Sequence, residues 1–310
     1  MKIVFMGTPG FAVHFLRHLQ ESSHRVLAVV TQPDRPSGRG RALVPPPVKS
    51  AALDLGLPVL QPESVKDPAF AESLRALDAD VFVVVAFSIL PAAVLKTSKY
   101  GAVNIHGSLL PRYRGAAPVQ WAIANGDQES GVTVFLLDEK MDHGPILEQR
   151  TVAITEDDTT ESLLEKMVAP GCAALDAALA TLESGNLRLS AQNHTQSSGA
   201  PKLKKTDGLI RWESAAAEIH NRIRAFTPWP GGFTAFNGKT VYLRKTSVRE
   251  NTGSLKPGEI RIDGKDMFAG TGNGLLQIIE IQVEGKRSMP VEEFLRGVQQ
   301  KEKLWFKNPD

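Results

Sequence analysis

The chain has 310 residues, of which 42% are hydrophobic. That is enough for a buried core, and the length is typical of about two domains. A single cysteine, Cys172, excludes an internal disulfide framework and a cysteine-based metal site. The net charge of +2 hides an asymmetry, because residues 201–310 carry 19 Lys and Arg against 13 Asp and Glu, whereas residues 1–200 carry 17 against 21. A basic C-terminal part indicates either binding to a polyanion or a solvated mixed surface.

The apolar run at residues 1–7 is too short for a signal peptide and leads directly into a turn. No apolar run reaches the roughly 18 residues of a membrane helix. We therefore expect a cytoplasmic protein that does not enter a membrane.

Apolar runs alternate with helical spacing through the first part of the chain. This βαβ alternation predicts an α/β fold, with a Rossmann-like open parallel sheet covered by helices on both faces. Strands are expected at 1–5, 26–30, 58–60, 79–86, 102–106 and 131–137, and helices at 11–19, 50–55, 70–77, 117–124 and 159–182, with the last helix capped near Thr159.

The character of the chain changes after residue 185. Residues 186–206 are polar and poorly periodic, which is typical of a linker. A helix at 214–224 is followed by short strands between turn signals such as Asn237-Gly238 and Asp263-Gly264, a pattern that predicts a small OB-like β-barrel. A helix at 291–299 is expected to close it. We therefore assign residues 1–185 to a catalytic domain, 186–206 to a linker and 207–310 to a second domain.

The segment from Asn104 to Pro118 is the most informative in the chain. Side chains alternate across a strand, so Asn104, His106 and Ser108 are expected on one face, at a strand end that breaks at Pro111. An acidic turn containing Asp142 follows about thirty residues later. An imidazole that moves a proton, an amide that holds a developing oxyanion and a carboxylate that fixes the imidazole suit attack on a carbonyl carbon.

Each of these residues also has an ordinary structural explanation. His106 alone could be a satisfied structural histidine, and Asp142 could be a turn former. His143 competes with His106 as the catalytic imidazole, although Gly144 beside it favours a loop role. The remaining histidines lack ligand spacing with acids, so no catalytic metal is expected. The Gly7–Gly10 turn lacks the G-x-G-x-x-G spacing, which argues against a nicotinamide cofactor.

Basic residues gather in two segments. Arg35, Arg39, Arg41 and Lys49 lie in a stretch that Gly and Pro are expected to keep out of regular structure, and three arginines in seven residues suit phosphate contacts. A solvated loop is the alternative. The linker adds Lys202, Lys204 and Lys205. Trp229, between two prolines, is interpreted as a packing anchor in preference to a base-stacking platform.

Taken together, these motifs resemble the methionyl-tRNA formyltransferase family along the whole chain. The resemblance is carried by Met6–Phe11, Thr31–Gly40, His106–Pro118, Gly131–Thr133 and Phe226–Pro230. The His106–Pro111 stretch is shared by the wider formylfolate-dependent transferases, and the arginine-rich loop and C-terminal domain narrow the resemblance to the tRNA enzymes. Two departures are visible: Ala86–Pro91 is one residue shorter than the usual form, and Ala200-Pro201 replaces the usual Tyr-Ala.

The resemblance implies formyl transfer from 10-formyltetrahydrofolate to the methionine α-amine of initiator Met-tRNA. It implies Asn104, His106 and Asp142 as the catalytic trio. It implies Ser108, Leu109, Leu110 and Pro111 as the folate loop. It also implies Arg39 as the arginine that engages the tRNA acceptor end, supported by the other cations of both basic segments. We expect a monomer without a metal.

Two other functions remain open from the sequence. Another formylfolate transferase could act on an amino-sugar nucleotide or a glycinamide ribonucleotide, but this would leave the arginine loop and the basic barrel without a purpose. A nucleic-acid-binding protein with a vestigial fold is the second, but phosphate binding needs none of the catalytic trio.

Overall fold

The structure is a computed structural model that describes residues 1–37, 42–187, 189–250, 255–298 and 304–308. The chain divides into two compact units. Unit 1 contains Met1–Pro118, Glu129–Ala153 and Leu164–Ala200, and unit 2 contains Val119–Gln128, Ile154–Leu163 and Pro201–Asp310. No helix in the described ranges is long and apolar enough to span a bilayer.

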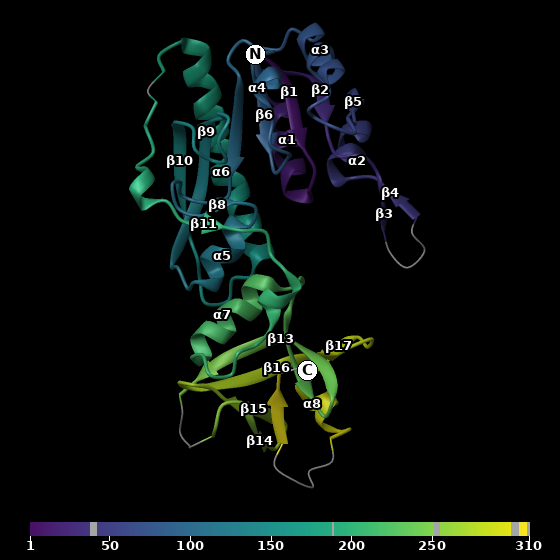
Figure 1. Cartoon of the computed structure of the whole chain (residues 1–310), viewed down its shortest axis with the longest axis vertical. Helices are drawn as coiled ribbons and strands as arrows, with labels where there is room; N and C mark the ends of the chain where they lie inside the picture. The colour runs from purple at the N-terminus through teal and green to yellow at the C-terminus, as the bar shows by residue number, and fades with distance from the viewer. Residues whose placement is uncertain (38–41, 188, 251–254, 299–303, 309–310) are drawn as a thin grey trace. The chain divides into compact units, whose positions relative to one another are not determined.

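A seven-stranded sheet in the order β10-β9-β7-β6-β1-β2-β5 forms the centre of unit 1 (Figure 1). The five strands from β7 to β5 run parallel, which confirms the predicted Rossmann-like α/β fold. β9 runs antiparallel to β7, and β10 antiparallel to β9. The strands are β1 (Lys2–Gly7), β2 (Arg25–Val30), β5 (Val59–Leu60), β6 (Val81–Val85), β7 (Ala102–His106), β9 (Glu129–Leu136) and β10 (Ile146–Ala153).

The predicted open parallel sheet thus has an antiparallel β9–β10 edge in addition to its five parallel strands. An apolar strand has the same composition in either direction, and its direction is set by the connection that precedes it. β10 was not predicted, because its first two residues are apolar and the next four, Glu148–Thr151, are polar, so the segment has neither a continuous apolar run nor strand alternation. The β9–β10 hairpin is important for the site, since its turn carries Asp142.

Helices cover both faces of this sheet. Side chains of α3 and α4 pack with Val4, Met6 and Phe82 on one face. On the other, Gly171 of α6 approaches the ring of Phe15 in α1 so closely that a Cβ atom would lie 2.8 Å from it. The helices are α1 (Gly10–Glu21), α2 (Pro47–Asp54), α3 (Pro68–Ala76), α4 (Ala92–Leu95), α5 (Pro118–Ala124) and α6 (Thr160–Ser184), of which α5 and α6 are divided between the units.

Two short strand pairs lie in segments that the sequence assigned to irregular structure. β3 (Arg35–Ser37) and β4 (Ala42–Val44) pair antiparallel, so part of the basic segment is regular, contrary to expectation. β11 (Gly199–Ala200), from the expected linker, pairs in parallel with β8 (Arg114–Gly115). A one-turn 3-10 helix, His194–Gln196, precedes β11. Backbone pairing of this kind leaves no hydrophobic periodicity in a polar segment, so a sequence pattern does not reveal it.

Unit 2 is a β-barrel, as predicted. Six strands close a ring in the described part of the chain, in the order β13-β12-β18-β14-β15-β16, with β16 pairing back to β13. Trp212 stacks on Phe306 inside it, with ring centres 5.0 Å apart. The elements are η2 (Lys205–Gly208), α7 (Ala216–Phe226), β12 (Gly232–Phe236), β13 (Lys239–Arg249), β14 (Glu259–Asp263), β15 (Asp266–Gly270), β16 (Leu275–Val283), β17 (Ser288–Pro290), α8 (Val291–Leu295) and β18 (Leu304–Lys307).

Two expectations about helix ends have different outcomes. The cap predicted near Thr159 is confirmed, because the Thr159 Oγ1 atom accepts from the Ser162 amide at 3.3 Å and the Ser162 Oγ atom accepts from the Thr159 amide at 3.0 Å. The helix predicted at 291–299 begins at Val291 as expected but is shorter, since α8 ends at Leu295; Gln299 lies outside the described residues, and β18 completes the barrel between β12 and β14.

Candidate active site

The three residues of the predicted trio come from two neighbouring elements of unit 1. Asn104 and His106 lie on β7, which is central in the sheet and pairs with β6 and β9. Asn104 is half-buried and His106 is 6% exposed. Asp142 lies in the turn between β9 and β10, with a positive φ of 49°. The structure therefore places the carboxylate beside the strand end that carries the imidazole.

A backbone carbonyl holds the His106 ring. The Nε2 atom lies 2.9 Å from the carbonyl oxygen of Tyr113, and since a carbonyl only accepts, Nε2 carries a proton. The Nδ1 atom faces Asp142 Oδ2 at 3.8 Å, which is too long for a hydrogen bond. The expectation that the carboxylate itself fixes the imidazole is therefore corrected. The Tyr113 carbonyl orients the ring, and the Asp142 carboxylate lies beside it without a direct hydrogen bond.

The Asp142 carboxylate is held in turn by the backbone of Gly115, whose amide donates to Oδ2 at 2.8 Å. Gly115 has a φ of +123°, and a Cβ atom there would lie 2.6 Å from the Ala200 carbonyl oxygen. Only glycine fits this position. Gly115 and Tyr113 both act through main-chain atoms, so their side chains give no signal in the sequence that could predict these roles.

The predicted folate loop, residues 108–111, is fixed by two residues that the sequence analysis missed. Thr133 Oγ1 donates to the Ser108 carbonyl at 2.6 Å and accepts from the Leu110 amide at 3.1 Å. Gln149 Nε2 donates to the Leu110 carbonyl and to Thr133 Oγ1, both at 2.9 Å. Ser108 and Leu110 are buried within the chain, which leaves Leu109 and Pro111 as the half-buried side chains of the loop.

His143, the competing imidazole, belongs to a different contact. Its Nδ1 atom lies 2.8 Å from Asp138 Oδ2, and its ring stacks on His194 with centres 4.0 Å apart. The structure therefore gives His143 partners of its own, and His106 is the histidine that faces Asp142. Among the described residues, no group of three or more His, Cys, Asp or Glu side chains could hold a metal ion.

Comparison with known proteins shows the family of this chain. Residues 1–179 match the family model described as formyl transferase, and residues 202–299 match that of the formyl transferase C-terminal domain. Proteins named methionyl-tRNA formyltransferase from Geobacter metallireducens and Koribacter versatilis are each 46% identical to the chain, over 96% of its length and 96% of theirs. The chain belongs to the methionyl-tRNA formyltransferase family.

The fold of this formyltransferase also recurs in a distant structure. HypX from Aquifex aeolicus in complex with tetrahydrofolic acid has a TM-score of 0.67 at 19% identity, covering 99% of this chain and 51% of that one. At this identity the likeness concerns the fold alone. It shows that both the sheet and the barrel are found in one larger protein.

The cations predicted to bind tRNA have different surroundings. Arg35 is exposed on β3, while Arg39 and Arg41 lie outside the described residues. The Lys49 ammonium pairs with Asp34 at 2.7 Å. A hydrogen bond from Gln61, followed by Lys49, holds the pKa of the Asp34 carboxyl below its usual value. The Lys49 ammonium is thus paired with a carboxylate of the formyltransferase itself, unlike a cation that awaits a phosphate.

The linker cations and Trp229 belong to unit 2. Lys202, Lys204 and Lys205 are exposed. Trp229 is 56% exposed, so its interpretation as a packing anchor is wrong, whereas Phe226 three residues earlier is fully buried. The sequence around Phe226 and Trp229 does not indicate which of the two rings is buried.

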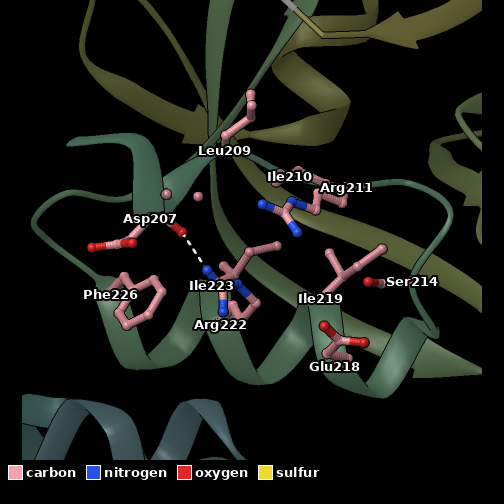
Figure 2. A pocket seen from close by; sticks show the side chains of 12 residues that line it. Asp207, Leu209, Ile210, Arg211, Ser214, Glu218, Ile219, Arg222, Ile223 and Phe226 are labelled. Atoms are coloured by element: carbon pink, nitrogen blue, oxygen red, sulfur yellow. Dashed lines mark hydrogen bonds between the residues drawn. The ribbon is translucent and has the colours of Figure 1, made fainter. Parts of the chain in front are cut away.

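A cavity of about 160 Å³ lies beside helix α7 in unit 2 (Figure 2). Arg222 Nη2 donates to the Asp207 carbonyl at 2.8 Å across one side of it. Glu218 and Arg211 bring opposite charges to its lining, so the cavity has no single charge preference. It is built by residues of unit 2, while the trio lies in unit 1.

Proposed function

We propose that this chain transfers the formyl group of 10-formyltetrahydrofolate to the α-amine of methionine on initiator Met-tRNA, giving N-formylmethionyl-tRNA. The near-full-length identity to formyltransferases of this name carries the proposal. The His106–Asp142 pair at the end of β7 supplies groups suited to the reaction. The rival of a vestigial fold does not account for a buried imidazole facing a carboxylate.

The chemistry is a direct transfer without a covalent enzyme intermediate. The folate supplies the formyl carbon: a bond forms from it to the methionine nitrogen, its bond to N10 breaks, the amine loses a proton and N10 gains one. The chain must therefore stabilise an oxyanion and move one proton. Both tasks fit an amide, an imidazole and a carboxylate.

Each residue of the trio has a role set by its free atoms. Because the Nε2–H group of His106 is bonded to Tyr113, Nδ1 is the atom available for proton exchange. The Asp142 carboxylate, 3.8 Å from Nδ1, stabilises a positive charge on that ring and takes the amine proton through water. Asn104, on the same strand face as His106, donates its side-chain amide to the oxyanion.

Substrate binding divides along the chain. Residues 1–185 form the catalytic domain, and their 108–111 loop lines the folate site. Residues 207–310 form a tRNA-binding barrel, and the 186–206 segment joins the two. Arg35, Arg39 and Arg41 contact phosphates near the acceptor end, with Lys202, Lys204 and Lys205 adding to the field. We expect a monomer that works in the cytoplasm.

One assay tests the function. Formyl-labelled 10-formyltetrahydrofolate is offered with charged initiator tRNA, charged elongator Met-tRNA, an amino-sugar nucleotide or glycinamide ribonucleotide. The proposal expects label on initiator Met-tRNA alone. Label on a small amine in preference to Met-tRNA would assign the chain to another formylfolate transferase, and binding of tRNA without transfer would support a binding protein.

A further inference from the structure

The segment Ser190–Ala200, which follows helix α6, contacts the backbone near two residues of the trio, Asp142 and His106. Ser190 exchanges two backbone hydrogen bonds with Ile146, at 2.8 and 2.9 Å, just after the Asp142 turn. Ser198 Oγ accepts from the Tyr113 amide at 2.9 Å. Since the Tyr113 carbonyl holds His106, the segment supports one catalytic residue at each end.

Gln192 is the buried centre of this segment, with 6% exposure. Its Nε2 atom donates to the carbonyl of Asp142 at 3.1 Å and to the carbonyl of Gly144 at 2.7 Å. Its Oε1 atom accepts from the Arg114 guanidinium. A carboxamide is the side chain that can donate twice on one side and accept on the other, so Gln192 uses both of its donors and one lone pair of its oxygen.

The Asp142 turn requires such a support. The positive φ of Asp142 costs some energy even for aspartate, which tolerates the left-handed region better than most residues, so contacts that hold the turn help to keep it. A Cβ atom at Gly144 would lie 1.8 Å from the Leu136 carbonyl oxygen, so the turn is packed against the end of β9 on one side. Gln192 holds it from another side, and the Gly115 amide holds the carboxylate itself.

Arg114 connects the Gln192 contact with the Gly115 contact. The guanidinium that donates to Gln192 belongs to the residue directly before Gly115, and it also donates to His194 Nδ1 at 2.8 Å. His194 stacks on His143, the neighbour of Asp142 in the turn. Burial, followed by the nearby His143 and Arg114, lowers the pKa of His194, which is consistent with an Nδ1 atom that accepts.

We propose that Gln192 is a positioning residue for Asp142, whose amide sets the backbone of the turn and so the place of the carboxylate beside His106. This assignment rests on the proposed function only for its kinetic consequence. The segment between the two domains is, on this view, a structural part of the active site.

The first test uses three variants. Gln192→Glu keeps the acceptor for Arg114 and removes both donors, Gln192→Met removes all three bonds at similar volume, and Gln196→Leu alters an exposed glutamine of the same segment. For both Gln192 variants we expect kcat of formylation to fall roughly 10- to 100-fold while KM for Met-tRNA and for folate change little, because a small misplacement of a catalytic group costs this much. The Gln196 variant should match wild type. Unchanged kcat in either folded Gln192 variant, or an equal rise in both KM values, would overturn the assignment.

The second test separates positioning from general stabilisation. In an Asp142→Asn background, Gln192→Met should have little further effect on kcat, since the group it positions is already lost. An equal loss in both backgrounds would show a merely structural role.

Hydrogen exchange of the Gly115 amide gives a readout without substrate: it should be faster in Gln192→Met than in wild type and in Gln196→Leu. Faster exchange in Gln192→Met, found together with a wild-type protein that formylates no tRNA, would keep the positioning role and sink the proposed function. Unchanged exchange in Gln192→Met would sink the positioning role.

Discussion

The Nδ1 atom of His106 lies 3.8 Å from the Oδ2 atom of Asp142, while the opposite ring nitrogen is bonded to a backbone carbonyl. The pair is close enough for charge interaction and too far apart for a direct hydrogen bond. The gap is also too narrow for a water molecule to stand in line between the two atoms, so a bridging water or substrate amine would contact both from one side. We therefore propose that Asp142 serves as a proton acceptor and a charge partner of His106, while the backbone carbonyl anchors the ring.

Asp142→Asn removes the charge but retains an oxygen that can accept from the Gly115 amide. We expect formylation turnover to fall roughly 100- to 10,000-fold, the range for loss of a positioned acid–base group. The melting temperature should stay close to that of wild type. Asp138→Asn is the matched control, because Asp138 lies in the same turn and pairs with His143. Near-normal turnover of the Asp142 variant would remove it from the mechanism.

Asn104→Ala removes the amide expected to donate to the oxyanion. Loss of one such donor lowers the rate roughly 100- to 1000-fold, so kcat with both substrates saturating should fall in this range. The KM for Met-tRNA should change little, since the donor is used chiefly in the transition state. A fall in affinity without a change in kcat would instead make Asn104 a binding residue.

Arg39→Ala tests the basic segment. An arginine can make forked contacts to phosphate, so its loss should impair formylation of full-length initiator tRNA and flatten the salt dependence of tRNA binding by about one unit of slope. Folate binding should be unaffected. Arg75→Ala, at an exposed arginine of α3, provides the control for a change in charge alone. An equal change of slope in both variants would deny Arg39 a specific contact.

Cys172 is expected to be inert in the native protein. Burial, followed by the Asp176 carboxylate, raises the pKa of its thiol from 9.0 to about 11. The thiol is then protonated at neutral pH and should react with a thiol reagent only after unfolding. The folded state holds this proton more tightly than the unfolded state, so stability should fall as the pH rises from 9.0 towards about 11, and less so in Cys172→Ala. Rapid labelling of the folded protein would contradict the prediction.

Much of the architecture could be predicted from local patterns. The continuous apolar run that becomes β6, the helical spacing of α1 and the turn dipeptide Asn237-Gly238 between β12 and β13 are short-range signals. These short-range signals could not predict the antiparallel direction of β9, because a strand's direction depends on the path of the connection that precedes it. The pairing of β11 with β8 joins residues about 85 positions apart through main-chain atoms, and the side-chain sequence carries no trace of it.

The sequence by itself determined the α/β sheet and the barrel, and it predicted Asn104, His106 and Asp142 as the residues that carry the chemistry. The tertiary structure decided how those residues are held. Tyr113 and Gly115 act through backbone atoms, which all residues share, and Gln192 acts across about 50 residues of chain. The physical reason is that a hydrogen bond depends on where a donor and an acceptor meet in space. Only the folded chain fixes that meeting.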